Sequence, residues 1–65
     1  MSVKELLEAM NLAPYNHVVV KKRVPGSELV GLGGGLPGTV EARFGELEVQ
    51  RTFIAANILN IVVYN

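Results

Sequence analysis

The 65-residue chain contains no cysteine, no tryptophan and no aspartate. Without cysteine it cannot form a disulfide, and one histidine without aspartate offers no set of metal ligands. Its longest apolar runs, residues 18 to 20 and 61 to 64, are far shorter than the ~20 residues of a membrane-spanning helix. The N-terminus also lacks the apolar stretch of a signal peptide. We therefore expect a soluble, cytoplasmic protein with no metal, no cofactor and no membrane partner.

The chain carries no excess of either charge, because six basic residues balance six acidic ones. A dedicated nucleic-acid binder is usually basic overall, so strong long-range attraction to phosphates is excluded, although a local basic patch is not. Hydrophobic residues make up 49% of the chain, which excludes disorder. Residues 1 to 65 are expected to form a single domain with a small core.

Residues 2 to 11 have the pattern of a short amphipathic helix. Ser2 and Glu5 are spaced as a capping box, and apolar side chains recur three and four residues apart from Val3 to Met10. Pro14 would end the helix, because proline disfavours helical geometry at the preceding residue. The apolar stripe must then pack on the rest of the chain.

From residue 17 onward the apolar period changes to two, which predicts strands. Residues 17 to 24 form a β-branched run in which Lys22 interrupts the apolar face, so we expect this strand at an edge or a subunit boundary. Pro25 and Gly26 mark a turn, and residues 27 to 32 form a second strand. The glycine-rich residues 33 to 38 are expected to be a loop or a sharply bent strand.

Residues 39 to 53 are expected to form a hairpin around Gly45 and Glu46. Glycine at the first central position suits a type II′ turn, and the resulting register pairs Phe44 with Leu47 and Arg43 with Glu48. With the strand expected over residues 58 to 64, the fold class is α+β, mainly β. The prediction is an N-terminal helix followed by a five-stranded, strongly bent antiparallel sheet or small barrel of Sm-like or SH3-like type.

The last predicted strand is apolar on both faces, which a strand of a lone small barrel would not need. We therefore predict a homo-oligomer that buries this strand between copies. The candidate interface residues are Ile58, Leu59, Ile61, Val62 and Val63.

One basic cluster interrupts the otherwise balanced sequence at residues 21 to 23. Alternation along a strand places Lys21 and Arg23 on one face with His17, where they could meet phosphates; the alternative is a solubilising edge strand. Only four aromatic residues are present, and with Phe44 expected in the core no strand is expected to carry the interleaved aromatics that stack on bases. The candidate nucleic-acid contacts are Lys21, Lys22, Arg23, Arg43 and Arg51.

Catalysis is not expected. His17 has no cysteine, aspartate or nearby serine with which to form a nucleophilic dyad, and Glu41, Glu46 and Glu48 fall on the solvated hairpin. The glycine run of residues 31 to 38 lacks the Gly-Lys-Ser/Thr of a phosphate-binding loop and the strand–helix–strand unit of a dinucleotide site. A bend is the default interpretation of this run.

Residues 18 to 32 resemble the first half of the Sm-like proteins, in which an N-terminal helix leads into a strand, a glycine turn and a second strand. Residues 53 to 61 are similar to the second Sm motif, but the first motif's aspartate is missing and Ala55-Ala56 stands where Arg-Gly occurs. The resemblance implies a ring of small barrels without the usual uridine pocket. Residues 3 to 25 also resemble sulfur-carrier proteins of the ubiquitin-like fold; those end in Gly-Gly, so carrier chemistry is not expected here.

Two classes of function remain open. One is a homo-oligomeric ring that binds RNA or other single-stranded nucleic acid through the basic residues. The other is a non-catalytic structural or scaffold protein, of a phage or mobile-element type, without a nucleic-acid ligand.

Overall fold

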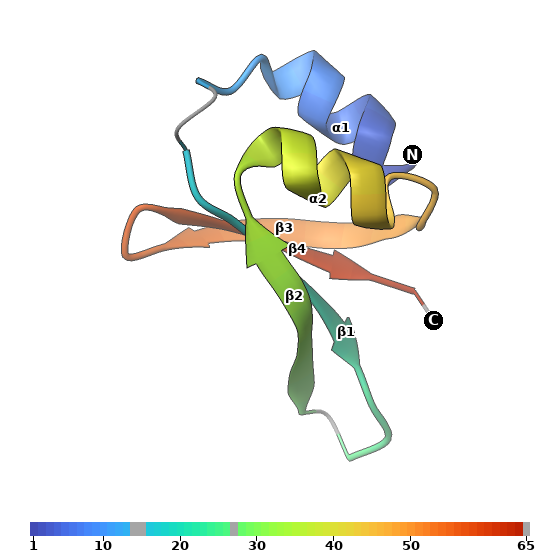
Figure 1. The fold of residues 1–65 in the computed structure, drawn as a ribbon. Coiled ribbons are helices and arrows are strands. Elements are labelled where there is room, and N and C mark those ends of the chain that lie inside the picture. The colour runs from blue at the N-terminus through green and yellow to red at the C-terminus, as the bar shows by residue number, and fades with distance from the viewer. Residues whose placement is uncertain (14–15, 27, 65) are drawn as a thin grey trace.

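The computed structural model describes residues 1–13, 16–26 and 28–64. Within these residues the elements are α1 (Val3–Met10), β1 (Val18–Arg23), β2 (Leu29–Gly35), α2 (Pro37–Phe44), β3 (Val49–Ala55) and β4 (Ile58–Val63). The strands form one sheet in the order β2-β1-β4-β3, and both helices lie on one side of it (Figure 1). The two outer pairs are antiparallel, and the central pair of β1 and β4 is parallel.

The fold is α+β and mainly β, but the prediction of a five-stranded antiparallel sheet or small barrel is wrong. The described residues form four strands in an open mixed sheet, and its edges β2 and β3 do not pair with each other. The sheet opens because β1 pairs with β4, which lies at the other end of the sequence. Such a parallel pairing needs a long crossover and leaves no local sequence signal.

The predicted hairpin over residues 39 to 53 is also wrong, because residues 37 to 44 form α2. Pro37 stands at the helix start, where its fixed φ suits the first turn, and Val40 is fully buried. Gly45 has a φ of −56°, so no positive φ was needed there. A Cβ at this position would instead collide with the carbonyl oxygen of Glu41, which accepts the Gly45 N–H at 3.0 Å.

The glycine-rich segment is mostly strand rather than loop, because β2 continues to Gly35. Gly33 faces α2, and a Cβ on it would lie 2.9 Å from the Phe44 ring. The absence of a side chain at Gly33 therefore lets α2 pack closely against β2. Residues 33 to 35 pair with β1, so this segment is an edge strand and not a phosphate-binding loop.

The N-terminal helix and its capping box are confirmed. The Ser2 hydroxyl accepts the Glu5 N–H at 3.1 Å, and the Glu5 carboxylate accepts the Ser2 N–H at 2.9 Å. The carbonyls of Leu47 and Gly45 accept the Val3 and Lys4 amides, each at 2.9 Å. All the free donors of the first turn are thus satisfied, and α1 is fixed to the segment that follows α2.

The core lies between the helices and one face of the sheet. The strand expected at an edge or a subunit boundary, β1, is not an edge strand, because β2 and β4 flank it. β4 is likewise central and forms as expected. The buried cluster comprises Val3, Leu7, Val18, Val20, Val40, Leu59, Ile61 and Val63.

Candidate nucleic-acid interface

The sheet has one covered face and one open face. Val18 and Val20 of β1 and Ile61 of β4 belong to the core beneath the helices. Side chains alternate along a strand, so the residues between them point away from the helices. The open face therefore carries Val19, Lys21 and Arg23 of β1, Asn60 and Val62 of β4, and Arg51 and Phe53 of β3.

Strand register aligns these side chains in two rows across the open face. Lys21 and Arg51 both pair with Val62, so the two cations flank that residue on neighbouring strands. Val19 and Phe53 both pair with Asn60 and form the next row. β1 and the distant β3–β4 hairpin thus supply one compact group.

The Phe53 ring is in contact range of both cations. The Lys21 ammonium is 5.7 Å from the ring centroid and the Arg51 guanidinium carbon is 5.4 Å from it. Both distances fall within the ~6 Å range of cation–π attraction. We call Lys21, Phe53 and Arg51 the basic–aromatic cluster.

The cluster lies on both sides of β4, the strand between β1 and β3. Val62 is fully buried although it is outside the core cluster beneath the helices. Its register partners on the two neighbouring strands are Lys21 and Arg51, whose aliphatic stems flank it on this face. Asn60 is also buried and donates its side-chain N–H to the Ile58 carbonyl at 3.0 Å. The β4 residues next to the cluster, Val62 and Asn60, are thus both buried.

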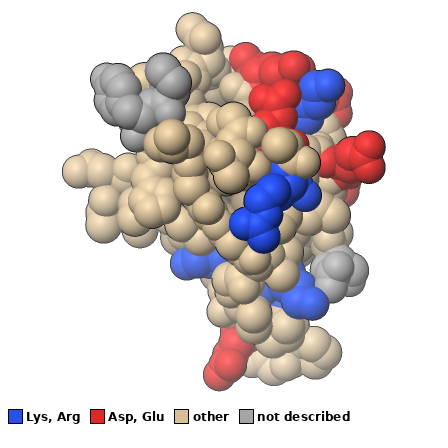
Figure 2. Space-filling model, viewed as in Figure 1, with Lys and Arg blue, Asp and Glu red and all other residues tan. Residues whose placement is uncertain are grey.

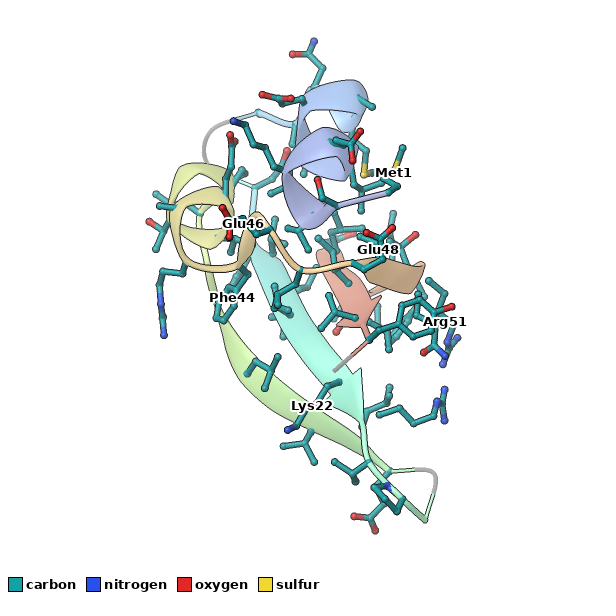
Figure 3. The ribbon with its side chains drawn as sticks, turned by 90° about the vertical axis from the view of Figure 1, so that its right-hand side faces the viewer. Met1, Lys22, Phe44, Glu46, Glu48 and Arg51 are labelled. Carbon is teal, nitrogen blue, oxygen red and sulfur yellow. The ribbon has the colours of Figure 1, made fainter. Side chains whose placement is uncertain are left out.

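The structure separates the five predicted nucleic-acid contacts into two groups. Lys21, Arg23 and Arg51 lie on the open face, with Arg23 at the exposed end of β1. Lys22 points to the helix side, and Figure 3 shows it extending away from Arg51. Arg43 lies on α2, with its guanidinium carbon 5.0 Å from the neighbouring Phe44 ring. The predicted pair of Arg43 with Glu48 does not form; Glu48 instead pairs with the N-terminal ammonium group.

The zero net charge conceals a strong segregation of charge between the two layers. Four of the six glutamates, Glu5, Glu8, Glu41 and Glu46, lie on the helices or just after α2, where only Lys4 and Arg43 are basic, whereas Glu48 directly precedes β3 and its carbonyl accepts the Tyr64 N–H. Four of the six basic residues, Lys21, Lys22, Arg23 and Arg51, lie on the strands, and Glu28 lies at the β1–β2 turn. In Figure 2 the acidic atoms gather mainly over the helices.

The other candidate groups do not form a reactive site within the described residues. His17 is exposed just before β1, and its carbonyl accepts the Leu59 N–H at 3.2 Å. No group of three or more potential metal ligands occurs in the part of the chain that the structure describes. The pKa of the Glu5 carboxyl is lowered, mainly by the hydrogen bond from the Ser2 backbone N–H and secondarily by the one from the Ser2 hydroxyl. These bonds belong to the cap of α1, so the lowered pKa does not mark a reactive site.

The predicted oligomer interface lies largely inside the protomer. Leu59, Ile61 and Val63 face the helices, Val62 lies beneath the basic–aromatic cluster, and Ile58 is half-buried. The two apolar faces of β4 are thus explained by packing within one chain. Self-association stays a prediction, but β4 no longer provides its reason.

Phe53 is the residue that sequence reasoning missed. Its strand was expected, but its proximity to Lys21 depends on the β1–β4–β3 register. The only local signal was that Phe53 follows Arg51 by two residues, which places both on the same face of a strand.

Comparison with known proteins finds no family model, no curated protein and no solved structure that matches the chain. In the described parts of the chain, neither helix is long and apolar enough to span a bilayer.

Proposed function

We propose that the protein binds single-stranded nucleic acid on the open face of its sheet. The observation that carries the proposal is the Phe53 ring with both Lys21 and Arg51 within cation–π distance of it. Aromatic side chains on a sheet face stack on unpaired bases, and flanking cations meet the backbone phosphates. An incoming base would displace one cation from the ring and leave it beside a phosphate.

Charge segregation supports the same face. The helix layer repels phosphates through its excess of glutamates, whereas Lys21, Arg23 and Arg51 lie on the open face. A chain without net charge can therefore still orient a polyanion toward one side. Single strands are favoured over duplexes, because a base must be unstacked before it can reach the ring.

The experiment compares binding of a labelled single-stranded oligonucleotide of about six nucleotides to three variants at low salt. Phe53→Leu keeps an apolar side chain but removes the ring, so the binding free energy should become less favourable by ~1–3 kcal/mol. Phe53→Tyr should retain binding. Ile54→Ala changes the neighbouring residue on the opposite face and serves as the control.

Lys21 and Lys22 provide a second matched pair, because they are adjacent but point to opposite faces. Lys21→Ala should weaken binding more than Lys22→Ala. Absence of binding by the wild type at low salt, or equal losses from both lysine variants, would refute the proposal.

A second candidate function is assembly with another copy of the chain through the β2 edge. β2 is seven residues long, carries no charged side chain and contains four glycines. Edge strands are normally blocked by charge or proline, and no backbone partner other than β1 occurs for it among the described residues. A strand without charge can pair with its own copy without like-charge repulsion.

The two edges allow a matched test of this assembly. Gly31→Lys adds a charge on β2, where a Cβ meets nothing within 4 Å, and Thr52→Lys adds the same charge to the exposed edge β3. The native mass from light scattering should exceed that of one chain for the wild type and Thr52→Lys, and should fall for Gly31→Lys. A monomeric wild type at micromolar concentration would rule this function out.

A further inference from the structure

Tyr64 lies on the same face as the basic–aromatic cluster. Its N–H donates to the Glu48 carbonyl at 3.0 Å, so the pairing of β4 with the β3 side continues past Val63. Because Val63 belongs to the core, alternation turns Tyr64 toward the open face, where 56% of it is exposed.

The spacing along β4 places the cations midway between the two aromatic rings. Phe53 pairs with Asn60, and Tyr64 lies four residues beyond Asn60. Lys21 and Arg51 flank Val62, the residue halfway between them. At roughly 3.3 Å per residue, the two aromatic positions are about 13 Å apart along the strand.

We infer that Tyr64 is a second stacking contact of this site, and that the ligand is an extended single strand of at least about three nucleotides running along β4. This inference rests on the proposed function. Neighbouring stacked bases are only ~3.4 Å apart, so two such bases cannot reach both rings. One base on each ring leaves a nucleotide between them, and its two phosphates pass the row of Lys21 and Arg51.

The test uses tyrosine fluorescence, because the chain has no tryptophan and two tyrosines. Tyr15→Phe leaves Tyr64 as the single reporter. Oligouridylates of increasing length are added to this variant, while a labelled oligouridylate reports affinity independently. We expect saturable quenching that becomes complete at about three nucleotides, with a dinucleotide giving less.

Two substitutions separate stacking from mere proximity. Tyr64→Leu should lower affinity for the longer oligonucleotides roughly 5- to 150-fold, as expected for loss of one stacked base, while Tyr64→Phe should keep it. Ile54→Ala is again the control. Thermal unfolding of each variant verifies that the fold is retained.

The possible failures are distinguishable. If the wild type binds no oligouridylate at low salt, the proposed function fails and this inference with it. If binding depends on Phe53 and Lys21 but Tyr64→Leu leaves it unchanged and the fluorescence does not move, the function stands and the role of Tyr64 is refuted. Equal affinity for a dinucleotide and a hexanucleotide would also refute the extended path.

Discussion

At the scale of single residues, the site depends on side chains whose positions the backbone fixes. Phe53 is partly buried and lies on the face of β3 away from the helices, where two cations are within cation–π distance of its ring. Lys21 and Lys22 are chemically identical neighbours, yet only Lys21 reaches the ring. The sequence revealed the cationic residues but not the face of the sheet on which each lies. An alternating pattern separates the two faces of a strand, but it does not say which face the helices will cover.

The turn between β3 and β4 contains a residue in an unfavourable conformation. Ala56 and Asn57 have φ values of 52° and 63°, and an alanine costs about 1–2 kcal/mol in this region, whereas asparagine is tolerated. Ala56→Asn should therefore raise the free energy of unfolding by ~0.5–1 kcal/mol. Urea denaturation measures it, and a loss of stability would contradict the turn geometry.

The cap of α1 gives a pH dependence. The Ser2 backbone N–H and hydroxyl hold the pKa of Glu5 below its ordinary value of 4.5. A lowered folded-state pKa stabilises the protein above the unfolded pKa, and this contribution disappears as the pH falls through the folded pKa. Glu5→Gln should lose less stability than the wild type between neutral pH and about pH 3. The urea midpoint of each protein is measured as a function of pH. Equal decreases of the midpoint for the two proteins on acidification would contradict this.

At the scale of elements, α1 was predictable and α2 was not. The capping box and the regular apolar stripe of α1 are local signals that its structure obeys. In residues 39 to 44, apolar residues at Val40 and Phe44 fit a helical spacing, while Val40, Ala42 and Phe44 also fit strand alternation. Pro37 at the helix start and packing of Phe44 on Gly33 decide for the helix.

The contact between α2 and β2 predicts that substitutions at two glycines of β2 will differ in their effect on stability. Gly33→Ala would place a Cβ 2.9 Å from the Phe44 ring, so it should destabilise the fold by ~1–3 kcal/mol. Gly31→Ala meets nothing within 4 Å and should change stability by no more than ~0.5 kcal/mol. Chemical denaturation of both variants checks the difference; equal effects would mean that α2 does not rest on Gly33.

At the scale of the whole molecule, the non-local pairing of β1 with β4 determines both the open sheet and the site. No local pattern encodes that pairing, which is why a closed antiparallel barrel was predicted and an open mixed sheet formed. The same pairing brings Lys21 toward Phe53 and Arg51. The net charge was equally uninformative, because the charges separate only when the helices pack on one side.

Charge segregation predicts a shallow salt dependence that specific residues control. Two phosphate contacts on a single strand give a slope of about −1.4 in log affinity against log salt. Lys21→Ala should reduce the magnitude of this slope by about 0.7, while Arg43→Ala on the acidic layer should leave it unchanged. Binding curves at several salt concentrations measure both, and a steeper loss from Arg43→Ala would place the ligand on the helices.

The central claim is that the face of the sheet away from the helices binds the ligand, and methyl NMR tests it most directly. Val62 and Ile61 are neighbours on β4 that point to opposite faces. On titration with a single-stranded oligonucleotide, we expect the methyl signals of Val62 and Val19 to shift while those of Ile61 and Val20 stay in place. Shifts confined to methyl groups beneath or on the helices, with Val62 unmoved, would contradict it.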